Sequence, residues 1–93
     1  MDITQLRTKI DHIDRTIIEA LAKRLALCPA IAEYKQEKHV PIEDPEREGK
    51  LLSSRTAWAR DLGISSAVIE DIYASILEES KTRQEEFLHL SNR

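Results

Sequence analysis

The sequence predicts an all-helical protein, and three observations lead to this prediction. Apolar side chains recur at steps of three and four residues over most of the 93-residue chain, which is the period of a helix. Helix-breaking residues are few, with two glycines and three prolines, and two of the prolines fall together in the segment HVPIEDPER. No stretch alternates with the two-residue period of a strand. We therefore expect three helices, the first much longer than the others, in one domain of residues 1–93.

The first helix is expected over residues 3–38. Pro29 lies inside it and has no N–H to donate to the carbonyl of Leu25, so we expect a kink or a missing hydrogen bond near residues 25–29. The apolar stripe of this helix consists of Ile3, Leu6, Ile10, Ile13, Ile17, Leu21, Leu25, Cys28 and Ile31.

The second and third helices are marked by their ends. Asp44 followed by Pro45 is a start signal, and Gly63 suits a left-handed C-terminal cap. The second helix is expected to bury one side, made of Leu51, Leu52, Ala57 or Trp58, and Leu62. Ser65 is the expected N-cap of the third helix, whose apolar stripe runs from Val68 to Leu88. Its opposite, charged face is expected to comprise Glu70, Asp71, Glu78, Glu79, Lys81, Arg83, Glu85 and Glu86.

The length of the first helix predicts a homodimer. A helix of about 35 residues is roughly 50 Å long, whereas a compact chain of this size has a diameter of roughly 30 Å. The apolar stripe continues along almost the whole helix, so a second copy is the expected cover, with the long helices intertwined in a symmetric dimer. The alternative is that Pro29 breaks the helix into a hairpin and the monomer closes on itself.

Composition excludes several classes of protein. The formal net charge of −3 and the even scatter of charges argue against nucleic-acid binding. No apolar run has the length of a membrane span or a signal peptide, and Cys28 is the single cysteine, so we expect a cytoplasmic protein. Cys28 and the three histidines show no metal-ligand spacing, and we expect neither a metal nor a cofactor.

Polar residues interrupt the apolar faces of the first and third helices. Arg24 and Lys35 lie 11 residues apart, so both point the same way about 16 Å apart and could close on one small ligand. Ser80 and Gln84 interrupt the stripe of the third helix at i, i+4 spacing. A buried charge or amide without a partner costs several kcal/mol, so these positions indicate a ligand or an internal pair. Alternatively, the cations extend to water and the third helix is solvated beyond Leu77.

The start of the second helix adds further charges. Asp44 and Glu48 suit a helix N-terminus for stability alone, but Arg47 is unfavourable there and requires an anion. The whole set contains no pair of nucleophile and base. It is suited to holding a small dianion and stabilising developing charge by electrostatics and shape.

The sequence resembles the all-helical, type II chorismate mutases over nearly its whole length. The resemblance rests on LRxxIDxID, the LAKR segment, Lys35, the loop PIEDPEREGKLL and the late SxxxQ, all in family order and spacing. It implies a three-helix chain that dimerises through its first helix. It also implies the cofactor-free Claisen rearrangement of chorismate to prephenate in aromatic amino acid biosynthesis.

The resemblance also implies roles for the cations. Arg24 and Arg47 would bind the substrate carboxylates within one subunit, and Arg7 would reach in from the other. Helix length agrees with this, because Arg7 lies about 42 Å along the helix from Lys35 and could meet it only through an antiparallel partner.

The remaining roles concern the reacting atoms. Lys35 and Gln84 would donate to the ether oxygen, where negative charge grows as the carbon–oxygen bond breaks. Glu48 would accept from the ring hydroxyl with help from Asp44. Ser80 would line the pocket and contact a carboxylate or hydroxyl.

Three alternatives stay open. Isochorismate-pyruvate lyases share the fold, and the stretch TAWARDLG resembles that branch, but the acids Asp44 and Glu48 favour the mutase. A 4-amino-4-deoxychorismate mutase is possible because Glu48 could accept from an amine as readily as from a hydroxyl. A helical dimerisation module without enzymatic activity is the alternative from another class.

Overall fold

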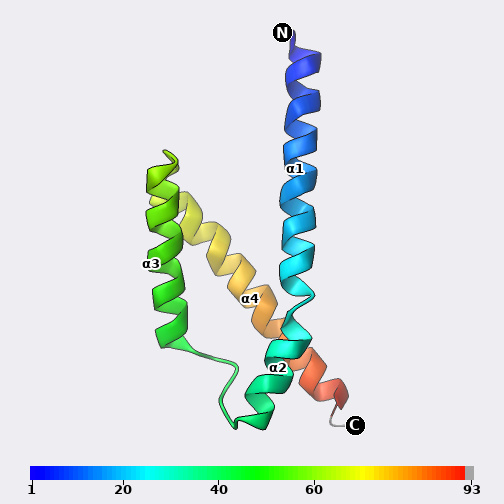
Figure 1. The fold of residues 1–93 in the computed structure, drawn as a ribbon, viewed down its shortest axis with the longest axis vertical. Helices are drawn as coiled ribbons and strands as arrows, with labels where there is room; N and C mark the ends of the chain where they lie inside the picture. Colours follow the sequence, from blue (N-terminus) through cyan, green and yellow to red (C-terminus); the bar gives the residue numbers. More distant parts are fainter. Residues whose placement is uncertain (92–93) are drawn as a thin grey trace.

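The computed structural model describes residues 1–91 and is all-helical in that range. Its elements are α1 (Ile3–Leu25), α2 (Cys28–Glu37), α3 (Pro45–Asp61) and α4 (Ser66–Ser91), as Figure 1 shows. The three expected helices are all present, so the all-helical part of the predicted fold class is confirmed, whereas the intertwined dimer stays a prediction. The expected first helix is divided into α1 and α2.

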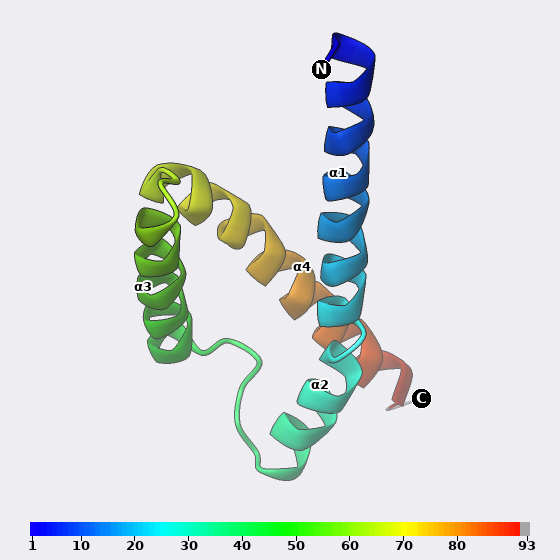
Figure 2. The same ribbon diagram turned by 45° about the horizontal axis from the view of Figure 1, so that its top comes forward.

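The division between α1 and α2 follows from Pro29. The helix α1 begins with a capping box, in which the Asp2 carboxylate accepts from the Gln5 N–H at 2.8 Å and the Gln5 side chain accepts from the Asp2 N–H at 2.9 Å. It ends at Leu25, and Pro29 lies in the first turn of α2, where no backbone donor is needed. The predicted kink is therefore confirmed. In both ribbon views, α2 leaves the direction of α1 and inclines toward α3 (Figures 1 and 2).

The helix α3 ends in a Schellman motif at the expected glycine. Gly63 has a φ of 75°, and the Ile64 N–H donates to the Ala59 carbonyl at 2.8 Å. The helix α2 ends in the same way, but its left-handed residue is His39, with a φ of 57°. Both motifs end a helix sharply, after which the chain leaves the helix axis toward the next helix.

The core lies where α4 crosses α2 and α3. Its buried apolar residues are Cys28, Ala32, Leu51 and Ala59. The predicted buried side of α3 was partly wrong, because Trp58 and Leu62 are 57% and 77% exposed. The buried side includes Leu51, as predicted, and continues to Thr56 and Ala59.

The helix α1 projects beyond this core. None of its residues is buried, and its apolar stripe is exposed in the described chain, including Ile3, Leu6, Ile10, Ile13 and Ile17. The chain measures 55 × 28 × 15 Å with a radius of gyration of 16.7 Å, against about 12 Å for a compact chain of this length. The helix α1 does not fold back on α2 to close a hairpin (Figure 2).

Candidate active site

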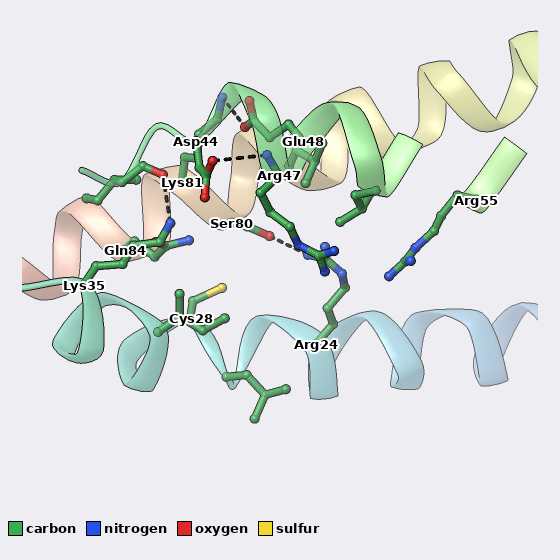
Figure 3. A pocket seen from close by; sticks show the side chains of 15 residues that line it. Arg24, Cys28, Lys35, Asp44, Arg47, Glu48, Arg55, Ser80, Lys81 and Gln84 are labelled. Atoms are coloured by element: carbon green, nitrogen blue, oxygen red, sulfur yellow. Dashed lines mark hydrogen bonds and ion pairs between the residues drawn. The ribbon is translucent and has the colours of Figure 1, made fainter. Parts of the chain in front are cut away.

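A cavity of about 390 Å³ lies between α2, α3, α4 and the last turn of α1 (Figure 3). This volume lies within the range of small-molecule sites. Seven of the eight predicted site residues line the cavity: Arg24, Lys35, Asp44, Arg47, Glu48, Ser80 and Gln84. The eighth, Arg7, is exposed on α1 and is not part of this lining.

Arg24 and Ser80 join α1 to α4 across the cavity. The Arg24 guanidinium donates to the Ser80 hydroxyl at 2.7 Å, and this hydroxyl donates in turn to the Ile76 carbonyl at 2.8 Å. Ser80 is only 6% exposed. The buried hydroxyl thus uses its proton within α4 and accepts from Arg24, which fixes one N–H of the guanidinium and leaves others for a ligand.

Lys35 and Gln84 lie together at one end of the cavity (Figure 3). The Lys35 ammonium donates to the Ile42 carbonyl at 2.8 Å, which anchors it to the segment between α2 and α3. Gln84 is 5% exposed, and its Oε1 is buried without a hydrogen-bond partner within residues 1–91. A buried acceptor in this state is unfavourable until a donor completes its hydrogen bond.

The first turn of α3 supplies a carboxylate and a cation. Asp44 is the N-cap, because its side chain accepts from the Arg47 N–H at 3.1 Å, and Pro45 follows as the first helical residue. The predicted helix start is confirmed. The Arg47 side chain leaves this turn and points into the cavity, toward the region that Arg24 also lines (Figure 3).

Lys81 is a cavity residue that the sequence reasoning placed wrongly on the charged outer face of α4. Its ammonium lies 3.0 Å from Glu48 Oε1 and 3.1 Å from Glu43 Oε1. Hydrogen bonds to Glu48 and then Glu43 raise the pKa of Lys81 above its usual 10.5, so it is a cation at neutral pH. Lys81 is four residues after Leu77, and this spacing could have placed it beside the apolar stripe.

Arg55 is a second residue that the sequence reasoning missed. It donates to the Ser54 hydroxyl at 2.8 Å, and its guanidinium carbon lies 4.5 Å from the centroid of the Trp58 ring. Its Nε is buried and has no hydrogen-bond partner in the part of the chain that the structure describes. Arg55 lies one turn from both Leu51 and Ala59, so the correct buried side of α3 would have identified it.

The cavity lining carries an excess of positive charge. Its cations are Arg24, Lys35, Arg47, Arg55 and Lys81, and its carboxylates are Asp44 and Glu48. Figure 3 shows the three arginines directed toward one side and the two acids on the other. This arrangement suits an anionic ligand that has carboxylates at one side and a hydrogen-bond donor at the other.

No group of three or more His, Cys, Asp or Glu within residues 1–91 could hold a metal ion. None of the helices described here has the length and hydropathy needed to cross a membrane.

Comparisons with known proteins agree with the resemblance. The family model for chorismate mutase type II matches residues 6–85. The chain is 39% identical to the T-protein of Enterobacter agglomerans over 83 residues, which are 89% of this chain but 22% of that protein. It is 29% identical to the chorismate mutase of Methanocaldococcus jannaschii over 86 residues, covering 92% and 87% of the two chains. It is 31% identical to the isochorismate pyruvate lyase of Pseudomonas aeruginosa over 75 residues, covering 81% and 73%.

Proposed function

Since this chain belongs to the type II chorismate mutase family, we propose that it catalyses the rearrangement of chorismate to prephenate in the cavity between α2, α3 and α4. One observation carries the proposal more than any other. The buried amide of Gln84 lies beside the Lys35 ammonium, so an amide N–H and an ammonium can donate to one oxygen in a cavity with more cations than carboxylates. A small dicarboxylate with a polar reacting centre matches that lining.

The carboxylates of the substrate are assigned to the arginine side of the cavity. Arg24 has one N–H fixed by Ser80, so its guanidinium is already oriented before the ligand arrives. Arg47 extends toward the same region from α3. Planar guanidinium groups bind carboxylates through paired hydrogen bonds, and an oriented pair would hold the enolpyruvyl group over the ring in the reactive conformation.

Lys35 and Gln84 are assigned to the ether oxygen. In the rearrangement one carbon–oxygen bond breaks while one carbon–carbon bond forms, and no proton is gained or lost overall. Electron density builds on the ether oxygen as the first bond lengthens. The ammonium of Lys35 and the amide N–H of Gln84 would strengthen their hydrogen bonds at that moment, which lowers the barrier instead of only tightening ground-state binding.

Glu48 and Asp44 are assigned to the ring hydroxyl. Both acids lie on the side of the cavity opposite the arginines, and the Asp44 carboxylate is oriented by its own N-cap hydrogen bond. A hydroxyl that donates to Glu48 would fix the ring relative to the carboxylates. Together these contacts restrict the substrate at three points.

We also propose that the active form is a homodimer with shared sites. An apolar groove between α1 and α4, lined by residues that include Ile17, Leu21, Ile72 and Ile76, continues the exposed stripe of α1. The α1 helix of a second copy would cover both, and its Arg7 would then complete the arginine side of the cavity.

The test is turnover of chorismate by the purified protein, with isochorismate and 4-amino-4-deoxychorismate assayed beside it. We expect chorismate to give the highest kcat/KM, and Lys35→Ala to abolish most of that turnover. Lys50→Ala is the matched control, because Lys50 forms only an exposed pair with Glu46. Faster reaction of isochorismate would favour the lyase, and no turnover of any of the three would favour the non-enzymatic module.

A further inference from the structure

Lys81 occupies an unusual place for a cation. It lies on α4 one residue after Ser80, on the wall of the cavity, and its ammonium is within hydrogen-bond distance of Glu48, the residue assigned to the ring substituent of the substrate. Its side chain is 26% exposed and that of Glu48 is 25% exposed, so both are largely removed from water. The substrate's ring substituent would therefore meet an ion pair and not an isolated carboxylate.

We propose that Lys81 determines specificity at the ring substituent: beside Glu48, it favours a substrate with a neutral hydroxyl over one with a protonated amine. This inference rests on the proposed function and names the substrate class of the same site.

Glu48 keeps hydrogen-bond acceptors free beside Lys81. Its Oε1 already accepts from Lys81 at 3.0 Å, while its remaining lone pairs can accept one more donor. A neutral hydroxyl can donate to this carboxylate and can also accept from a nearby ammonium. A neutral hydroxyl therefore adds no charge to the Lys81–Glu48 ion pair, whose two charges stay balanced.

A primary amine on the ring is different, because alkylamines are protonated at neutral pH. An ammonium bound to Glu48 would lie about one carboxylate's width from the Lys81 ammonium, and the two like charges would share one negative charge. Repulsion at this distance is strong where water is largely excluded. Glu43 offsets it only in part, since its side chain is 66% exposed and is not part of the cavity lining. Asp44 also lines the cavity, but it is present whichever substrate binds, so it does not by itself distinguish the hydroxyl from the amine.

The pairs of Lys81 also contribute to the fold, because they join α4 to Glu43 before α3 and to Glu48 in the first turn of α3. A purely structural role would change the site for every substrate alike. The selectivity between hydroxyl and amine substrates is therefore the quantity that distinguishes the two roles.

The experiment compares kcat/KM for chorismate and for 4-amino-4-deoxychorismate in wild type and three variants. Lys81→Met keeps the length of the side chain and removes the charge, and we expect the ratio to shift at least tenfold toward the amino substrate. Lys81→Arg restores a cation and should keep the ratio within about threefold of wild type. Lys50→Met removes an exposed lysine paired with Glu46 and should leave the ratio unchanged. Thermal unfolding of each variant reports on the fold.

The outcomes separate this inference from the proposed function. If wild type converts chorismate but Lys81→Met loses activity on both substrates in equal proportion, Lys81 is structural and the inference is wrong. A shift in Lys81→Arg as large as in Lys81→Met would overturn it too, because charge would not be the cause. If wild type converts neither substrate, the proposed function fails and the inference fails with it.

Discussion

A shared active site predicts that two inactive variants restore each other. Arg7 lies on the projecting α1, outside the cavity, whereas Arg24 lines the cavity of its own chain. We expect Arg7→Ala and Arg24→Ala each to lose most activity. Removing one partner of a desolvated charge pair costs roughly 2–5 kcal/mol, which corresponds to a loss of about 30- to 4,000-fold in kcat/KM.

The activity recovered when Arg7→Ala and Arg24→Ala are mixed follows from how the two chains of a dimer share their sites. When equal amounts of the two variants are unfolded and refolded together, about half of the dimers contain one chain of each kind. In a mixed dimer, the cavity of the Arg7→Ala chain has its own Arg24 and receives Arg7 from its partner, so it is complete. The other cavity lacks both arginines. About one quarter of all sites are therefore intact, and activity should rise to about one quarter of wild type.

The assay is the initial rate of chorismate disappearance before and after mixing, at fixed total protein. The matched control mixes Arg24→Ala with Lys35→Ala, because both residues line the same chain's cavity and neither site of a mixed dimer is then complete. Activity that stays at the level of the separate variants in the first mixture would refute the shared site, and recovery in the control mixture would refute the assignment of Arg24 and Lys35 to one chain.

Three further predictions concern catalysis, assembly and binding. Lys35→Ala and Gln84→Ala should each lower kcat by roughly 100- to 1,000-fold with a smaller change in KM, measured by steady-state kinetics, since both residues are proposed to stabilise charge that develops in the transition state. Ile13 is 59% exposed in the single chain, so its burial in a dimer adds about 1–2 kcal/mol per chain, twice per dimer. Ile13→Ala should thus weaken dimerisation about 30- to 1,000-fold by sedimentation equilibrium, while Arg15→Ala on the opposite face should not. Arg55→Met should raise KM roughly 10- to 100-fold if the buried Nε binds a substrate carboxylate, and an unchanged KM would show that Arg55 only stacks on the α3 surface.

Much of the fold could be predicted from the sequence because its signals are local. The pairs Asp44–Pro45 and Leu62–Gly63 set the two ends of α3. They act through the local backbone, by capping and by a left-handed residue, so their effect does not depend on the neighbouring helices. Pro29 likewise predicts the break between α1 and α2 through its missing donor. These features depend on residues a few positions apart.

The cavity was predicted less completely because charge alone does not tell which side of a helix faces inward. Lys81 and Arg55 are long, charged residues among many others in a chain that is one-third charged, and both border an apolar stripe instead of interrupting it. Their inward position depends on how α3 and α4 rotate against each other in the packed structure. That rotation is set by contacts far apart in the sequence.

The bend between α1 and α2 affects the spacing of the reactive groups. Arg24 is in the last turn of α1 and Lys35 is in the last turn of α2, so the cation proposed for the carboxylates and the donor proposed for the ether oxygen lie on opposite sides of the bend. A straight helix would keep them about 16 Å apart. The bend at Ala26 and Leu27 therefore changes the distance between these two cations, and Pro29, which does not line the cavity, helps to set that distance.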